Sequence, residues 1–212
     1  MHSFYPLNIN IRGKKCLVVG GGKTAERKVS TLLRYGGKVV LVSPEATDTI
    51  RKYHRQKQIT WHQRKFRFAD LKGTLLVFSA TSDKTLNKTI GRKARRKSIL
   101  VNVVDDPQEC DFISPSLVER GYLTVSISTG GTAPLIAKQI RQDLEEYFGR
   151  EYCRYTELVA KVRHIINTNN NLSPQEKRKK IKQFLSLNIL DQLAQGKKVS
   201  HTTILKRLGV KS

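Results

Sequence analysis

The chain has 212 residues, of which 40 are Lys or Arg and 17 are Asp or Glu, so its formal net charge is +23 at pH 7. This length holds one large domain or two small ones, and no apolar stretch is long enough to cross a membrane. The positive charge favours a polyanionic partner, such as a nucleic acid, an anionic surface or a small substrate with several negative charges.

The start of the chain and its cysteines predict a cytoplasmic protein. Residues 1–15 lack the apolar core of a signal peptide. Cys16, Cys110 and Cys153 are far apart and form no metal-binding or redox motif, which fits a reducing compartment. The five histidines show no ligand spacing either. We therefore expect no resident metal site.

Residues 16–25 form the most informative motif in the chain. An apolar run ends at Gly20, Gly21 and Gly22, and a helical pattern begins with Ala25 on its apolar face. A strand, a glycine turn and a helix in this order are typical of the corner that binds the phosphates of a dinucleotide. Gly20 allows a tight turn, and Gly22 lets a pyrophosphate approach the backbone at the positive end of the helix. An ordinary strand–helix connection is the alternative interpretation.

The second strand of this unit departs from the usual dinucleotide pattern. A buried strand at 39–42 completes the β-α-β unit, but Ser43, Pro44 and Glu45 follow it where a carboxylate usually binds the adenosine ribose. Ser43 can hydrogen-bond a ribose hydroxyl. These residues alone leave the choice between NAD and NADP open.

The first half of the chain alternates between strands and helices. Short β-α alternation predicts a parallel sheet with right-handed crossovers, and continuous apolar runs predict strands that are covered on both faces. The fold class is therefore α/β. The expected strands are 16–19, 39–42, 59–62, 75–80 and 99–104, and the expected helices are 23–35, 45–56 and 84–97.

The pattern changes near residue 112. Residues 123–128 alternate between apolar and polar, as in a half-buried strand, and a helix with one apolar stripe follows. Beyond residue 150 only helical patterns occur, including a capping box at 173–176. The stripe consists of Ile136, Ile140, Leu144 and Phe148.

Four segments together resemble one known family, the precorrin-2 dehydrogenases of siroheme synthesis, including the dehydrogenase/ferrochelatase portion of siroheme synthase. Their order and spacing match the family over residues 4–148. The segments are Phe4-Tyr5-Pro6-Leu7 with Arg12-Gly13; the glycine motif at 18–28; Asn102-Val103-Val104-Asp105 with Phe112-Ile113 and Pro115-Ser116; and residues 126–134.

The resemblance implies three parts and a homodimer. The parts are an NAD-binding Rossmann domain at 1–113, a small α+β dimerisation region at 114–149 and a helical domain at 150–212. The family oxidises precorrin-2 to sirohydrochlorin with NAD, and some members then insert ferrous iron. We expect the dehydrogenase activity here; iron insertion is an alternative that the sequence leaves open. Precorrin-2 itself is expected from another protein, because the chain has no room for a fused methyltransferase domain.

Asp105 is the expected catalytic residue. It follows the fifth strand, at the sheet edge where open α/β proteins bind ligands, and it aligns with the aspartate that the family treats as catalytic. Removing a hydride from the tetrapyrrole also requires loss of a proton, which a carboxylate can accept. The adjacent Asp106 would raise the pKa of one of the two carboxylates. A simple polar turn at 105–107 is the alternative.

The resemblance also implies cofactor contacts. Asn102 and Val103 are expected near the nicotinamide, and Thr81 near the cofactor crevice. The remaining cofactor-binding residues, near the pyrophosphate and adenosine, are Gly20, Gly21, Gly22, Lys23, Thr24, Ser43, Pro44 and Glu45.

Two further possibilities concern other regions. In some family members a serine at this place is phosphorylated, but this chain offers two hydroxyls, Ser128 and Thr129, and we favour a turn and helix-capping role for both. A non-catalytic Rossmann module that binds nucleic acid through its basic helices is a competing hypothesis. The basic stretches lack interleaved aromatic residues and known nucleic-acid motifs, which disfavours it.

Overall fold

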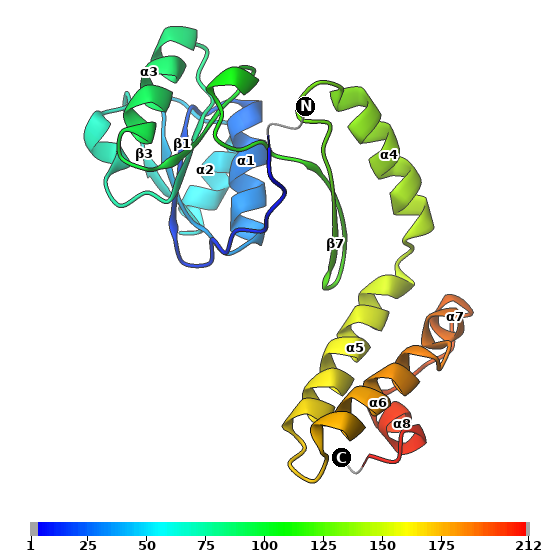
Figure 1. Cartoon of the computed structure of the whole chain (residues 1–212). Helices are drawn as coiled ribbons and strands as arrows, with labels where there is room; N and C mark the ends of the chain where they lie inside the picture. The colour runs from blue at the N-terminus through cyan, green and yellow to red at the C-terminus, as the bar shows by residue number, and fades with distance from the viewer. Residues whose placement is uncertain (1–3, 211–212) are drawn as a thin grey trace. The chain divides into compact units, whose positions relative to one another are not determined.

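The computed structural model describes residues 4–210 and divides into two compact units, residues 1–114 and 115–212 (Figure 1). Within the described residues, no helix combines the length and apolar character needed to cross a membrane.

The first unit is an α/β sandwich around a five-stranded parallel sheet, which confirms the expected fold class. The strand order is β3-β2-β1-β4-β5, so the direction of winding reverses between β1 and β4. In chain order the elements are β1 (Lys15–Val19), α1 (Lys23–Arg34), β2 (Lys38–Val42), α2 (Asp48–Arg55), β3 (Thr60–His62), the 3-10 turn η1 (Phe68–Leu71), β4 (Leu76–Ser79), α3 (Lys84–Arg95), β5 (Leu100–Val103) and the 3-10 turn η2 (Pro107–Glu109).

The central strand β1 supplies side chains to two separate cores. Cys16 and Val18 face α1, where they pack with Val29. Leu17 faces the opposite layer and packs with Ile90 of α3. Alternate side chains of a strand point to opposite faces, so a strand covered on both sides needs an unbroken apolar run. Figure 1 shows α1 and α3 on opposite sides of the sheet.

Several expected elements are shorter than the sequence pattern indicates, and the boundaries of two of them bear on the site. The helix expected at 45–56 begins at Asp48, because the Thr47 hydroxyl caps it by accepting the backbone N–H of Ile50 at 3.4 Å. The strand expected at 99–104 ends at Val103, and Asp105 then adopts a left-handed backbone with φ of +63°. Both boundaries fall next to the sheet edge that forms the candidate site.

The second unit contains a β-hairpin and five helices in the described residues. No expected strand corresponds to β6, the first strand of the hairpin, whereas its partner β7 is the expected alternating strand. The helix α4 ends at Tyr147, so Phe148 of the expected stripe lies just beyond it. The elements are β6 (Ser116–Arg120), β7 (Leu123–Ile127), α4 (Pro134–Tyr147), α5 (Glu151–Thr168), α6 (Pro174–Leu185), α7 (Ile189–Ala194) and α8 (His201–Arg207).

Two local features organise this unit. The hairpin turn packs on α5: a Cβ at Gly121 would lie 2.5 Å from the Thr156 hydroxyl, which also accepts the backbone N–H of Tyr122. The expected capping box is present, because Ser173 and Glu176 each accept the other's backbone N–H. The helices α5 to α8 enclose their own apolar core, which includes Leu158, Val162, Ile166, Phe184, Ile189, Ile204 and Leu205.

Candidate active site

The carboxyl ends of four parallel strands bring the predicted site residues of the first unit to one edge of the sheet. The turn at 20–22 follows β1, residues 43–45 follow β2, Thr81 lies beyond β4, and Asp105 lies beyond β5. The crevice outside the switch point between β1 and β4 is where open α/β sheets bind ligands. The topology thus gathers residues that are far apart in the sequence.

The three glycines of the turn have different roles. A Cβ at Gly20 would overlap the carbonyl oxygen of Ala80, and the backbone φ of +113° also excludes ordinary side chains. A Cβ at Gly21 would overlap the carbonyl oxygen of Glu45. A Cβ at Gly22 would meet no described atom within 4 Å. Protein packing therefore explains the first two glycines, and Gly22 alone faces open space.

The open space at Gly22 adjoins the start of α1. Gly22 is the N-cap of this helix and offers no side chain to bind the free N–H groups of the first turn. Lys23 is exposed and lies 3.3 Å from Glu26. Unfilled room, free donors and a nearby ammonium fit a pyrophosphate, so the residues present suit a dinucleotide cofactor.

The loop after β2 supports this turn. The backbone N–H of Thr47 donates to the carbonyl of Gly21 at 3.0 Å, which holds the two loops together. Ser43 is buried, and its carbonyl accepts the indole N–H of Trp61 at 3.0 Å. Pro44 and Glu45 are exposed. Their side chains are thus accessible at the edge where the adenosine half of a dinucleotide would lie.

A polar network that the sequence analysis missed holds Thr81 at the end of β4. The side-chain oxygen of Asn87 accepts the hydroxyls of Ser79, at 2.9 Å, and of Thr81, at 2.7 Å. The Asn87 amide donates back to the carbonyl of Thr81 at 2.9 Å. The sequence does contain a signal for this network: Ser79 is a polar residue at the end of an apolar run, and Asn87 lies on the buried face of the helix that follows.

Asn102 and Val103 anchor the segment that follows the 3-10 turn η2. The amide nitrogen of Asn102 donates to the carbonyl of Phe112 at 2.9 Å, and the backbone N–H of Val103 donates to the Cys110 sulfur at 3.2 Å. Burial raises the pKa of the Cys110 thiol. Both predicted nicotinamide contacts therefore lie at the site edge and also hold its loop in place.

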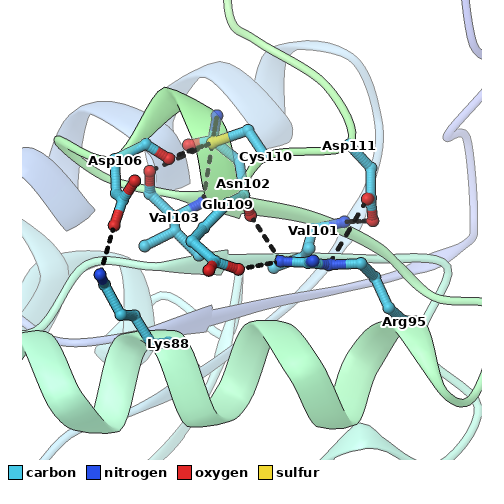
Figure 2. Close-up of polar contacts among 9 residues, drawn as sticks. All are labelled: Lys88, Arg95, Val101, Asn102, Val103, Asp106, Glu109, Cys110 and Asp111. Atoms are coloured by element: carbon cyan, nitrogen blue, oxygen red, sulfur yellow. Dashed lines mark hydrogen bonds and ion pairs between the residues drawn. The ribbon is translucent and has the colours of Figure 1, made fainter.

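Ion pairs to α3 fix the same loop from the other side (Figure 2). Lys88 lies 3.4 Å from Asp106. Arg95 pairs with Glu109 and lies 3.7 Å from Asp111. Asp111 in turn accepts the backbone N–H of Val101 at 3.1 Å. We call these contacts, together with the Cys110 bonds, the loop clamp.

Asp105 differs from the carboxylates of the loop clamp. Its side chain is exposed, and within residues 4–210 it takes part in no ion pair. Its backbone is held in the left-handed region, where Asp and Asn are tolerated better than most residues. The clamp therefore presents one uncommitted carboxylate at the sheet edge.

The site also contains a lysine to which the sequence analysis gave no role. Lys28, on the second turn of α1, places its ammonium 3.1 Å from the Ser114 hydroxyl and 5.1 Å from the ring centroid of Phe78. Burial lowers the pKa of Lys28, the like charge of Arg27 adds to this effect, and the carboxylate of Asp105 opposes it. A lysine on an amphipathic helix ordinarily indicates a solvated face, so the sequence pattern gave no reason to assign Lys28 to the site.

The described residues contain no group of three or more His, Cys, Asp or Glu side chains that could hold a metal ion.

Comparison with family models identifies the class of protein. The NAD(P)-binding family model matches residues 7–116, which include every candidate site residue named above. The model for the central part of sirohaem biosynthesis proteins matches residues 120–147. The chain therefore belongs to the NAD(P)-binding family, and its middle part matches sirohaem biosynthesis proteins, which confirms the resemblance found in the sequence.

Individual relatives agree with this assignment. The chain is 38% identical over 172 residues to a siroheme synthase of Methylobacillus flagellatus, covering 81% of this chain and 37% of the relative. It is 34% identical over 193 residues to a siroheme synthase of Pseudoalteromonas atlantica, covering 91% and 42%. The chain thus spans about two fifths of the length of these curated relatives.

One solved structure resembles the whole chain. The structure of SirC, a precorrin-2 dehydrogenase, has a TM-score of 0.82 and 25% sequence identity, and the match covers 97% of this chain and 99% of that one. The fold of both units therefore has a known counterpart.

Proposed function

We propose that this protein is an NAD-dependent dehydrogenase that oxidises precorrin-2 to sirohydrochlorin. The observation that carries the proposal is the placement of an open, uncapped helix N-terminus at Gly22 and a free carboxylate at Asp105 on the same sheet edge. The likeness to SirC along the whole chain supports this substrate, and so do the siroheme synthase relatives.

In this proposal, different residues of the site bind the cofactor and accept the proton. When bound, NAD supplies the acceptor for the hydride that leaves the tetrapyrrole. The N–H groups at the start of α1 hold the pyrophosphate, and the free face of Gly22 lets it approach. Asp105 accepts the proton that the substrate loses with the hydride, and water at its exposed side chain carries that proton away.

The loop clamp has a supporting role in this mechanism. Proton transfer needs the carboxylate within hydrogen-bond reach of the substrate proton. The ion pairs of Lys88 and Arg95 and the bonds of Cys110 restrain the residues on the C-terminal side of Asp105. A carboxylate on a restrained loop keeps its position at little entropic cost when the substrate binds.

A second part of the proposal concerns assembly. The helix α4 exposes Leu135 by 80% and Ile136 by 58%, and Ile140 is also exposed. A small α+β region with this much uncovered apolar surface is stabilised by a symmetric partner. We assign residues 114–149 to dimerisation and propose a homodimer, which sedimentation at micromolar concentration tests. A fully active monomer would contradict it.

The test of function is a two-stage assay on the purified protein. Precorrin-2 and NAD should yield sirohydrochlorin and NADH, both followed by absorbance, with NADP as the comparison cofactor. Failure to form sirohydrochlorin with either cofactor would refute the proposal. Ferrous iron is then added to the sirohydrochlorin formed, and a spectral change to siroheme in excess of a protein-free control identifies a bifunctional enzyme.

A further inference from the structure

Lys28 holds a positive charge in an unusual setting. Its ammonium donates to the Ser114 hydroxyl at 3.1 Å and lies over the ring of Phe78 at 5.1 Å. That ring is 5% exposed and packs edge to face against Phe112, with centroids 5.2 Å apart. The cation is thus half-buried between an aromatic face and a hydroxyl, both from the first unit.

Other half-buried cations pair with a carboxylate or donate to backbone carbonyls, whereas within residues 4–210 Lys28 donates only to a hydroxyl. Arg64 lies 2.6 Å from Asp70, and the Lys15 ammonium donates to the carbonyl of Asp70 at 2.7 Å. Within residues 4–210, no carboxylate oxygen lies within 4.0 Å of the Lys28 ammonium. Removing a charge from water without a partner is costly, so this site favours an anion from outside the chain.

The neighbours of Lys28 are suited to receive such an anion. The Ser114 oxygen accepts from Lys28, so its own hydroxyl proton is available to an incoming oxygen. Asp105 is close enough to act on Lys28 electrostatically, yet beyond ion-pair distance. An anion held by Lys28 would therefore bind next to Asp105 without displacing an existing ion pair.

We propose that Lys28 binds a carboxylate of the tetrapyrrole substrate and thereby orients the macrocycle beside Asp105. This inference rests on the proposed function, since precorrin-2 and sirohydrochlorin both carry several carboxylates. Lys28 is a substrate-binding residue in this scheme, and Ser114 is the second donor to the same carboxylate.

The effect of removing the ammonium should appear in binding and not in turnover. A hydrogen bond between charged partners is strong, and its loss should weaken tetrapyrrole binding by roughly 10- to 100-fold. The substrate carboxylate is bound equally in the ground state and the transition state, so KM for precorrin-2 should rise while kcat changes little. NAD affinity should stay unchanged.

The experiment compares Lys28→Gln, Lys28→Arg and a matched control. Lys38→Gln removes the same charge from an exposed residue at the opposite, amino-terminal edge of the sheet. Sirohydrochlorin is titrated into each protein without NAD, by absorbance, and KM and kcat are then measured with precorrin-2. We expect weaker binding for Lys28→Gln, partial recovery for Lys28→Arg and parental behaviour for Lys38→Gln.

Several outcomes would overturn the inference. Parental sirohydrochlorin affinity in Lys28→Gln would do so. A fall in kcat with a shifted pH profile and an unchanged KM would instead assign Lys28 to control of Asp105. If Lys28→Gln does not fold, Lys28→Met preserves the aliphatic packing over Phe78, and unfolding of that variant would make the ammonium structural. A parent protein that neither oxidises precorrin-2 nor binds sirohydrochlorin refutes the proposed function itself.

Discussion

The loop after β1 and the loop after β5 lie at the same sheet edge, but their conformations are determined in opposite ways. The turn at 20–22 depends on missing side chains, because the backbones of Ala80 and Glu45 fill the space beside Gly20 and Gly21. The loop at 105–111 depends on side chains, because Asp106, Glu109 and Asp111 pair with α3 and the Cys110 thiol bonds to β5 (Figure 2).

This difference separates the two tasks of the site. A bare backbone turn suits a bulky anionic cofactor, which needs room and N–H donors more than it needs particular side chains. A clamped loop suits proton transfer, which needs one carboxylate at a defined position. Each region also has one residue that its local packing leaves free: Gly22 in the turn and Asp105 in the loop. Substitutions at these two positions should have clearly different effects.

The largest expected effect is at Asp105. Asparagine keeps the shape of the side chain and tolerates the left-handed backbone, whereas alanine would add strain at φ of +63°. Asp105→Asn should lower dehydrogenase turnover by roughly 10²- to 10⁴-fold, because the proton acceptor is lost. NAD affinity should stay at the parental value. Turnover is measured with saturating precorrin-2 and NAD, so that weakened binding is not mistaken for lost chemistry.

The neighbouring carboxylate is the control for this prediction. Asp106 is occupied by Lys88 at 3.4 Å, so Asp106→Asn should cost much less turnover than Asp105→Asn. A dead Asp106→Asn beside an active Asp105→Asn would show that the wrong carboxylate was assigned. Activity in both variants would mean that solvent or the substrate's own carboxylates take the proton.

The next effect concerns cofactor binding at Gly22. Gly22→Asp should fold normally, since the backbone φ is −79° and no described atom lies within 4 Å of the new Cβ. The added carboxylate would occupy the space of the pyrophosphate and repel it, which should weaken NAD binding by roughly 10- to 100-fold. Titration of NAD into the folded variant measures this. An unchanged NAD affinity would remove the cofactor from this end of α1.

At Gly20 the expected loss is in stability. Gly20→Ala places a Cβ against the carbonyl of Ala80 and forces a side chain into a backbone conformation with φ of +113°. Strain of this kind costs about 1–3 kcal/mol of unfolding free energy. Gly22→Ala is the matched control and should leave the unfolding free energy nearly unchanged. Equal stabilities in denaturant titrations would contradict the division of roles within the turn.

The sequence predicted the elements whose signals are local. Continuous apolar runs located the parallel strands, and the glycine motif located the turn before α1. The position of Asp105 followed from the fifth strand, since parallel strands end at one edge. These predictions needed only neighbouring residues and the rule that β-α alternation produces a parallel sheet.

The missed features depend on contacts between distant residues. The strand β6 escaped notice because Val118 is its only buried residue and three of its five residues, Ser116, Glu119 and Arg120, are polar. The role of Lys28 depends on Ser114, 86 positions away. The loop clamp requires Arg95 at the end of α3 to meet Glu109 in η2, which no local pattern encodes.

The smallest expected effect tests the loop clamp itself. Arg95→Gln removes the ion pairs that Arg95 makes with Glu109 and Asp111. Because the Arg95 side chain is 37% exposed, the loss of local stability should be no more than about 1 kcal/mol. Brief opening of the loop should then expose Cys110 more often. Because burial raises the pKa of this thiol, the closed loop holds less reactive thiolate than a free cysteine does at the same pH.

Alkylation of Cys110 near pH 8, resolved by mass spectrometry, should therefore be several-fold faster in Arg95→Gln than in the parent. Arg92→Gln is the matched control, because Arg92 is an exposed arginine on the same helix. If the clamp positions Asp105, turnover in Arg95→Gln should fall by a few-fold while NAD affinity at the glycine turn stays the same. Faster labelling with unchanged turnover would mean that the clamp only stabilises the loop and that Asp105 holds its position without it.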